Sequence, residues 1–356
     1  MSEAAELLRL VLLPFLLFCG SLLTALIAYL FIQRLTREIA EKRRQAMIAL
    51  YRPLIDAVTC FGVTAALRDR LEAAPPSHRR FIGELLLAPL RTARGDIVTH
   101  VREAAQTVGL TKDWLADLTH RRWWRRADGV RALGAVEERS ALSAVLLALD
   151  DDHEEVRAAA VEAAGRLGDL RALPALLGHL GDGSRYQRAR VIEALRNLGP
   201  AVTPGLVEFV RCRPELTRLA AEIFGMIGTV AAIDPLLEWC DDRRGDVRAA
   251  ALHAIGSLGI DDRSYYFVLR GLGDADPHAR AMAARALGRG RREDAVSYLA
   301  ERLDDEWLPA AQAAGALQRL GAPGRAALEA RARDEGQAGD LARQMLWTRG
   351  LGPAQA

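Results

Sequence analysis

Cysteine and histidine, the residues that form disulfides and zinc sites, are few in this 356-residue chain. Its four cysteines are Cys19, Cys60, Cys212 and Cys240, and none belongs to a Cys-x-x-Cys pair. The seven histidines are scattered without the spacing of metal ligands. These spacings argue against a disulfide framework and a zinc site, so we expect reduced thiols and no bound metal.

The sequence also lacks the short motifs of common catalytic sites. It contains no Gly-x-x-x-x-Gly-Lys-Ser/Thr phosphate loop, no His-Glu-x-x-His zinc motif and no Gly-x-Ser-x-Gly nucleophile turn. Residues 288–292 read Gly-Arg-Gly-Arg-Arg, but they follow a helical pattern and not a strand, so we expect a solvated turn there. The sequence therefore predicts no catalytic residue, no cofactor and no enzymatic activity.

Charged side chains are missing from residues 10–33. As a helix, these 24 residues would span about 36 Å, which is more than the roughly 30 Å of a hydrocarbon core. A cleaved signal peptide is the alternative, but its apolar stretch is shorter and its leader basic, whereas this leader carries Glu3 and Glu6. We predict that residues 1–33 are a retained transmembrane anchor.

Charge is distributed unevenly in the rest of the chain. Residues 34–131 hold 19 Lys and Arg against 11 Asp and Glu, whereas residues 132–356 hold 28 against 33. The positive-inside rule then places the N-terminus outside and everything after residue 33 in the cytoplasm, at a bacterial inner membrane. Basic residues close to the bilayer are expected to contact anionic lipid headgroups. The candidates for this contact are Arg34, Arg37, Lys42, Arg43, Arg44, Arg121 and Arg122.

A helical pattern rich in small residues recurs eight times in the second two-thirds of the chain, at spacings of 29 to 34 residues. Such a period is typical of a stacked-helix solenoid, and no strand-like alternation is present. We predict an all-α fold with a repeat array over residues 120–350 and a tail over residues 351–356. Residues 34–119 form a basic helical region that is either separate or an atypical N-terminal cap. The copies end at Gly134, Gly168, Gly199, Gly228, Gly259, Arg291, Gly321 and Gly350.

Each copy has a first helix, an acidic turn and a second helix. In the best copies the second helix begins at Val156 or Val247 and stops at Gly168 or Gly259. We expect the turn aspartates to cap the N-terminus of the second helix and the terminal glycine to supply a left-handed C-cap. Alanine, which is abundant in the second helices, favours helix and lets neighbouring helices approach closely.

The Asp-rich turn, the following Val-Arg-x-x-Ala and the Ala-x-x-Leu-Gly ending resemble HEAT repeats, specifically the short bacterial class also seen in phycobilin-lyase-type proteins. The resemblance covers about residues 120–350. It implies an α-solenoid in which turn aspartates and second-helix arginines form a ladder between adjacent repeats. Thr217 and Ala310 occupy the arginine position in two copies, where the ladder should be broken. The matching arginines are Arg157, Arg188, Arg248 and Arg280.

Two aromatic groups are candidates for contact with a partner. Residues 121–126 place four arginines around Trp123 and Trp124. This arrangement suits lipid or membrane-protein contact, nucleic-acid binding, or a helix whose tryptophans pack in the core while its arginines reach solvent. Tyr265 and Tyr266 form the second group. We expect at least one aromatic residue of each group to lie in the core.

The second helices of a right-handed stack of helix pairs usually line its concave side, which is the extended interface of such proteins. Arg190 and Arg285 fall on second helices but outside the ladder position, so both are candidate partner-binding residues.

These features together predict a membrane-anchored cytoplasmic scaffold that binds a protein partner on a solenoid surface, as an accessory subunit of envelope machinery. On analogy alone, a membrane-embedded glycosyltransferase that makes or exports polysaccharide is one client of this kind. The alternative is an enzyme or nucleic-acid-binding module on the same fold, lyase-like or DNA-repair-like, which would need converging polar residues or a basic groove. The net negative charge of residues 132–356 argues against nucleic acid as a partner.

Overall fold

The computed structural model describes residues 2–93, 95–182 and 185–348. Side chains are described for Phe18 and from residue 21 onward within these ranges, except at Arg91, Asp182, Arg185 and Thr348. All regular secondary structure in the described ranges is helical, which confirms the predicted all-α fold. The chain forms two compact units, residues 1–112 and 113–356, and each is described by itself.

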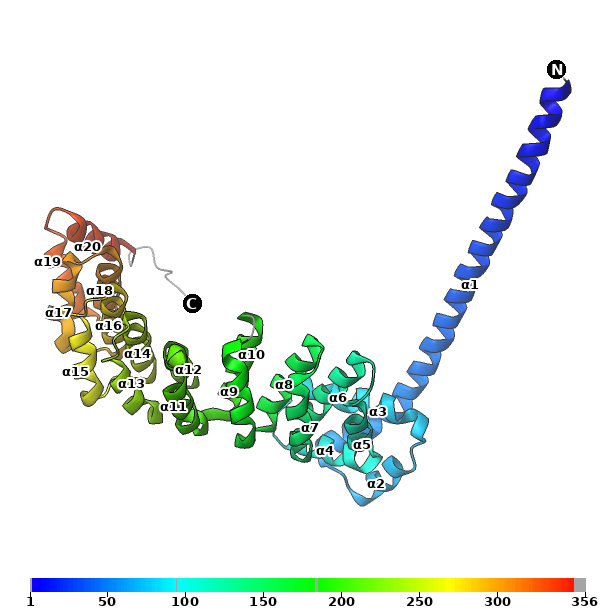
Figure 1. The fold of residues 1–356 in the computed structure, drawn as a ribbon, viewed down its shortest axis with the longest axis horizontal. Helices are drawn as coiled ribbons and strands as arrows, with labels where there is room; N and C mark the ends of the chain where they lie inside the picture. Colours follow the sequence, from blue (N-terminus) through cyan, green and yellow to red (C-terminus); the bar gives the residue numbers. More distant parts are fainter. Residues whose placement is uncertain (1, 94, 183–184, 349–356) are drawn as a thin grey trace. The chain divides into compact units, whose positions relative to one another are not determined.

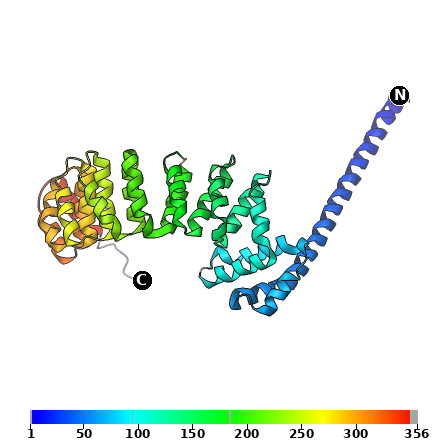
Figure 2. The same cartoon turned by 60° about the horizontal axis from the view of Figure 1, so that its bottom comes forward.

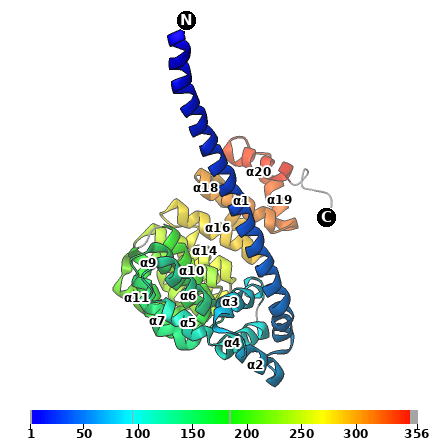
Figure 3. The same cartoon turned by 90° about the vertical axis from the view of Figure 1, so that its right-hand side faces the viewer.

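The first unit gathers three short helices at the C-terminal end of one long helix (Figure 3). Helix α1 (Ser2–Phe61) continues through Pro53, because the carbonyl that loses its partner belongs to exposed Ala49. It ends at Gly62, whose φ of 75° turns the chain back. Three further helices follow, α2 (Ala65–Glu72), α3 (Arg79–Leu87) and α4 (Asp96–Val108). Their common core includes Leu54, Val58, Leu71, Ile82, Leu86 and Val101.

Among the residues that the structure describes, no helix is both long and apolar enough to cross a membrane. The predicted anchor of residues 1–33 finds no support there. Among residues 1–20, only Phe18 has a side chain that the structure describes.

The second unit is a row of antiparallel helix pairs (Figures 1 and 2). The second helices of successive pairs pack side by side, each against the next. In Figure 1 they lie on the inner side of the curve of this unit, and the first helices lie on the outer side. The first helices are α5 (Leu110–Asp117), α7 (Leu142–Leu147), α9 (Leu173–Asp182), α11 (Thr203–Cys212), α13 (Ile233–Trp239), α15 (Asp262–Gly271), α17 (Val296–Glu301) and α19 (Ala322–Arg331). The second helices are α6 (Trp123–Ala135), α8 (Glu154–Leu167), α10 (Arg185–Leu198), α12 (Thr217–Ile227), α14 (Gly245–Leu258), α16 (Pro277–Gly290), α18 (Trp307–Arg319) and α20 (Gln337–Thr348).

Glycine and alanine bring the second helices unusually close together. At four glycines inside these helices, a Cβ atom would lie 2.6 Å from an alanine of the next helix, so no larger residue fits. The backbones therefore approach to the short end of the usual interaxial range, about 8 Å. The facing pairs are Gly134 with Ala163, Gly165 with Ala194, Gly256 with Ala286, and Gly288 with Ala316.

The terminal glycines turn the chain back after the second helices with positive φ, but not all of them are the predicted left-handed C-caps. Gly168, Gly228 and Arg291 are left-handed C-caps, whereas Gly259 at ψ 144° and Gly321 at ψ −134° have another conformation. Gly134, predicted to end the first copy, is instead buried within α6, and the left-handed residue there is Glu137 at φ 52°. A glycine inside the helix contact and a glycine at its end look alike in sequence. Gly350 lies outside the described residues.

Candidate functional site

A ladder of arginine–aspartate pairs joins the turns of successive repeats. In each pair a second-helix guanidinium donates two hydrogen bonds of 2.6–2.8 Å to both carboxylate oxygens of an aspartate in the next turn. The side chains are only 10–16% exposed. Each arginine also donates to backbone carbonyls of its own turn, so that it connects two turns. The pairs are Arg126 with Asp151, Arg248 with Asp274, and Arg280 with Asp305.

The sequence predicted two of these three arginines. Arg126 was missed, because it follows Trp-Trp-Arg, whereas Arg157 and Arg248 of the best copies follow valine. Arg157 donates to the Asp151 and Asp152 carbonyls at 2.8 and 3.1 Å, and Arg188 Nε has no hydrogen-bond partner among the described residues. The acidic residue next along the ladder from Arg157 is Asp182, whose side chain lies outside the described residues.

The turn aspartates have a different role from the predicted N-cap. Asp151 and Asp242 each accept a hydrogen bond from the backbone N–H two residues later, at 2.9 and 2.8 Å, so they lie before the N-cap position. Asp276 is the exception and caps α16 through the N–H groups of His278 and Ala279. Asp151, Asp274 and Asp305 offer both carboxylate oxygens to the ladder guanidinium of the preceding repeat, whereas Asp242 pairs with Arg244 of its own turn.

The ladder carboxylates are held ionised. The hydrogen bonds from Arg126 lower the pKa of Asp151, and Asp151 in turn raises the pKa of Arg126. Burial alone would raise the pKa of Asp274, but the bonds from Arg248 and from a backbone N–H outweigh it, so the pKa is lowered. A carboxylate that stays ionised far below neutral pH cannot serve as a general acid. The ladder is therefore a structural connection between repeats.

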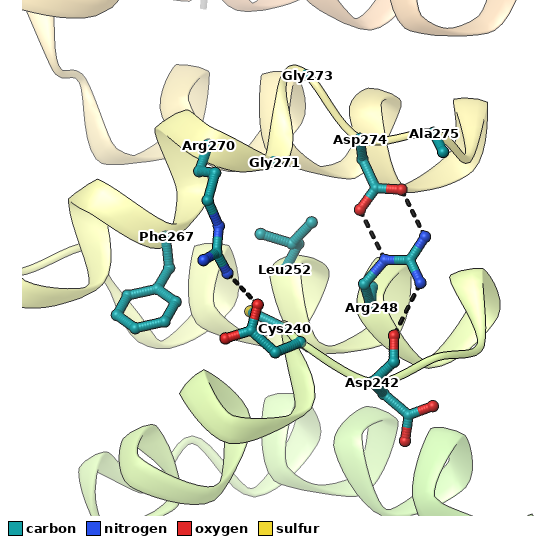
Figure 4. A pocket seen from close by; sticks show the side chains of 11 residues that line it. Cys240, Asp242, Arg248, Leu252, Phe267, Arg270, Gly271, Gly273, Asp274 and Ala275 are labelled. Carbon is teal, nitrogen blue, oxygen red and sulfur yellow. Dashed lines mark hydrogen bonds and ion pairs between the residues drawn. The ribbon is translucent and has the colours of Figure 1, made fainter.

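One cavity of about 300 Å³ opens beside the ladder, between the repeat that ends in α14 and the next one (Figure 4). Arg270 forms an ion pair with Asp241 across it, and Arg248 binds Asp274 on its other side. Burial raises the pKa of the Cys240 thiol to about 12, so the sulfur stays protonated at neutral pH and is a poor nucleophile. Within the described residues, no group of three or more His, Cys, Asp and Glu side chains could hold a metal ion.

The tryptophans of residues 121–126 lie on the surface, and the prediction of a core tryptophan there was wrong. Trp123 is 39% exposed and stacks on His153 with ring centroids 4.0 Å apart. Trp124 is 43% exposed, and the Arg122 guanidinium lies 5.2 Å from the centre of its ring. Smaller residues of α6, among them Val130, fill the core positions of this helix instead.

The arginines of the same run divide into two kinds. Arg126 belongs to the ladder, and Arg125 forms an ion pair with Asp117 at 3.0 Å. Arg121 and Arg122 are exposed, so only these two keep a solvent-facing charge.

The second aromatic group lies on α15, one of the outer first helices. Tyr265 is half-buried with the Arg292 guanidinium 4.2 Å from its ring centre, and burial raises the pKa of its hydroxyl. Tyr266 is 63% exposed and packs edge-on against half-buried Phe267. No aromatic residue of this group is fully buried. Arg292, from the segment resembling a phosphate loop, is paired with Asp262 and Asp294 in a turn.

The basic residues predicted to meet lipid headgroups are exposed in both compact units. Arg34 pairs with Glu38 at 3.0 Å, and Arg37 bonds Gln33 on the same helix. Lys42, Arg43 and Arg44 are exposed further along α1. These five residues belong to the first compact unit, whereas residues 121–122 belong to the second.

The inner face of the second helices lies opposite their buried side. In α14, the buried residues Val247, Leu252 and Ile255 share one side of the helix, and the helical period places His253 and Ser257 on the other. These two residues stand five and nine positions after the ladder arginine, Arg248. The same two positions therefore mark the inner face of every second helix.

On the first half of this face, from α6 to α12, four arginines pair with carboxylates, whereas Arg190 pairs with none that the structure describes. Arginine and carboxylate side chains meet within one helix or between adjacent helices at 2.5–3.7 Å. Arg190, a predicted binding residue, is half-buried and its guanidinium lies 4.5 Å from the centre of the Tyr186 ring. The ion pairs are Arg131 with Glu155, Arg166 with Glu162, Arg196 with Glu193, and Arg218 with both Glu222 and Asp246.

The second half of the face, on α14, α16 and α18, carries three arginines and a histidine without carboxylate partners among the described residues. His253 and Arg285 are half-buried, and Arg289 and Arg319 are exposed. No ion pair is formed by any of the four with a described residue. Arg285, the other predicted binding residue, thus belongs to a cluster that the sequence did not reveal, and it lies three second helices away from Arg190.

Comparisons with known proteins place these features in context. Solved structures similar to this chain include the CpcE–CpcF complex of phycocyanin lyase from Nostoc, with 20% identity over 67% of this chain and 94% of that one and a TM-score of 0.31. Importin beta matches with 13% identity over 82% and 49% and a TM-score of 0.46. Human deoxyhypusine hydroxylase matches with 18% identity over 85% and 98% and a TM-score of 0.29.

No curated protein matches the sequence significantly. Residues 111–196 and 233–318, however, match the sequence profile of HEAT repeats. These segments include all three Arg–Asp ladder pairs. These two segments of the helical array are therefore HEAT repeats.

Proposed function

We propose that this protein is a non-enzymatic scaffold that binds a protein partner on the inner face of its second helices. The observation that carries the proposal is that this face exposes polar and charged side chains from helix to helix. The sides of the same helices are closed by the Gly–Ala contacts, and their opposite side packs on the first helices. A surface of this kind, repeated at a fixed spacing of about 8–10 Å, suits an extended partner.

Photo-crosslinking tests this proposal. Met226, on the inner face of α12, is 55% exposed, uncharged and outside the ladder. A photoreactive amino acid at Met226 should capture a discrete protein in cells, whereas the same group at Tyr266, 63% exposed on the outer helix α15, should not. Capture from Tyr266 alone would move the binding surface to the outer helices. If Trp123→Ala together with Trp124→Ala abolished the capture, the binding surface would lie at the start of the array.

We further propose that residues 1–33 anchor the scaffold in a bacterial inner membrane, with the N-terminus outside and residues 34–356 in the cytoplasm. The proposal is supported by the 24 uncharged residues from 10 to 33 and by the basic residues that follow them. Among these, Arg34, Arg37, Lys42, Arg43 and Arg44 are proposed to contact anionic lipid headgroups.

A scaffold held at this membrane would suit a membrane-embedded partner of the envelope machinery, such as a polysaccharide-synthesising glycosyltransferase, on analogy only. Two measurements test the anchor and its orientation. The chain lacking residues 1–33 should leave the membrane fraction and keep a helical circular dichroism spectrum. An alkaline phosphatase fused after residue 356 should be inactive, and activity there would reverse the orientation.

A further inference from the structure

Three arginines and one histidine gather on the inner face of three consecutive second helices. His253 lies on α14, Arg285 and Arg289 lie one turn apart on α16, and Arg319 lies on α18. The Arg289 guanidinium reaches across to α14 and donates to Ser257 Oγ at 2.7 Å. The Gly–Ala contacts that join α14 to α16 and α16 to α18 keep these helices about 8 Å apart, so the cations are neighbours.

Nothing in the described part of the chain neutralises this cluster. Burial lowers the pKa of His253, and the charges of Arg285 and Arg289 lower it further. Burial also lowers the pKa of Arg289, with added repulsion from Arg285 and Arg319. Residues 344–356 contain no Asp or Glu that could neutralise the cluster.

The contrast with the rest of the face makes the cluster informative. From α6 to α12, Arg131, Arg166, Arg196 and Arg218 each have a carboxylate within 3.7 Å, and Arg190 is the exception. Like charges held together cost free energy that an anionic ligand would recover. Three neighbouring arginines without carboxylate partners in the described ranges are therefore suited to receive negative charge from outside.

The dimensions of the cluster favour a short acidic protein segment. Guanidinium groups bind carboxylates with two parallel hydrogen bonds. Helices about 8–10 Å apart match about three residues of an extended chain, which rises about 3.3 Å per residue. A long polyanion such as nucleic acid would also run over the neighbouring helices, where Glu193 and Glu222 stand on the same face, and residues 132–356 are net negative.

We propose that His253, Arg285, Arg289 and Arg319 form a docking site for an extended acidic segment of the partner, with a carboxylate at about every third residue. The proposal rests on the inner face being the binding surface, and it adds the charge and spacing of what binds there. It makes α14 to α18 the end of the array that selects the partner, and α6 to α12 a neutral continuation of the same surface.

A defined peptide tests the site in the full-length protein, purified in detergent. The probe is a short fluorescein-labelled peptide with glutamate at every third position and serine between. It should bind, as measured by fluorescence anisotropy, and Arg285→Ala with Arg289→Ala should weaken it by about tenfold or more. Arg131→Ala with Arg218→Ala, which removes two paired arginines of the same face, should change the affinity by less than about twofold. Circular dichroism melting curves establish that both variants are folded.

Three results would overturn the proposal. The first is that the wild-type protein does not bind the peptide. The second is that the two double variants lose equal affinity for it. The third is that the wild-type protein binds oligothymidylate, or vesicles of anionic lipid, with the same affinity as the peptide. The last result would indicate a general polyanion site. None of them bears on the crosslink from Met226, which lies outside the cluster, so failure of this proposal and failure of the scaffold function remain distinguishable.

Discussion

Replacing Arg248 by leucine should destabilise the contact between two repeats far more than replacing an exposed arginine of the same array. Arg248 is 16% exposed, binds both oxygens of Asp274 at 2.6–2.7 Å and donates to the Asp242 carbonyl at 2.8 Å. Leucine would leave the carboxylate of Asp274, itself 12% exposed, without its counter-ion. Removing one partner of a largely buried pair costs about 3 kcal/mol.

The matched control is Arg218→Leu. Arg218 also bridges to the next second helix, through Asp246 at 3.7 Å, and it pairs with Glu222 within its own helix. Its side chain is 48% exposed, however, and surface pairs of this kind contribute about 0.5 kcal/mol.

Hydrogen exchange measured by mass spectrometry reports the difference locally. A loss of about 3 kcal/mol corresponds to roughly 150-fold faster exchange of the amides whose protection depends on the α14–α16 contact. Arg218→Leu should accelerate exchange by only about twofold. If both variants exchanged alike, the ladder would contribute no more than surface ion pairs, and the reasoning from burial would be wrong.

Three further predictions follow from the same contacts. The folded-state pKa of Asp274 is lowered from 3.8, so its pairing stabilises the fold above pH 3.8 and this stabilisation is lost as the pH falls through the lower folded value. The melting temperatures of wild type and Asp274→Asn should therefore differ at pH 6 and converge in stronger acid. Gly288→Ala should lower the melting temperature by an amount equivalent to about 2 kcal/mol, because its Cβ would meet the Ala316 backbone at 2.6 Å, whereas Gly315→Ala, with nothing closer than 4.0 Å, should raise it slightly. At pH 8 a maleimide should label exposed Cys212 readily and spare Cys240. The Cys240 pKa of about 12 leaves about a thousandfold less thiolate than an ordinary pKa of 9.0 would. Rapid labelling of Cys240 would show that its repeat opens.

The period of the array could be read from sequence because it depends on local chemistry. Alanine and the acidic turns mark the second helices, and residues such as Gly168 and Gly259 end them in a conformation that other residues rarely adopt. Even Arg291, which is not a glycine, was placed correctly by the period alone. Gly134 was misassigned because a glycine needed for a close helix contact and a glycine needed for a C-cap are the same letter.

The sequence by itself thus determined an all-α array of HEAT-like repeats and the position of two ladder arginines, Arg248 and Arg280. Only the tertiary structure showed that Arg126 belongs to the same ladder, and that Arg285 stands among arginines without described carboxylate partners while Arg131, Arg166, Arg196 and Arg218 of earlier repeats are paired. The physical reason is distance along the chain. Helix formation depends on neighbours three or four residues apart, whereas the ladder bonds join side chains 25 or 26 residues apart and Arg289 bonds a serine 32 residues away.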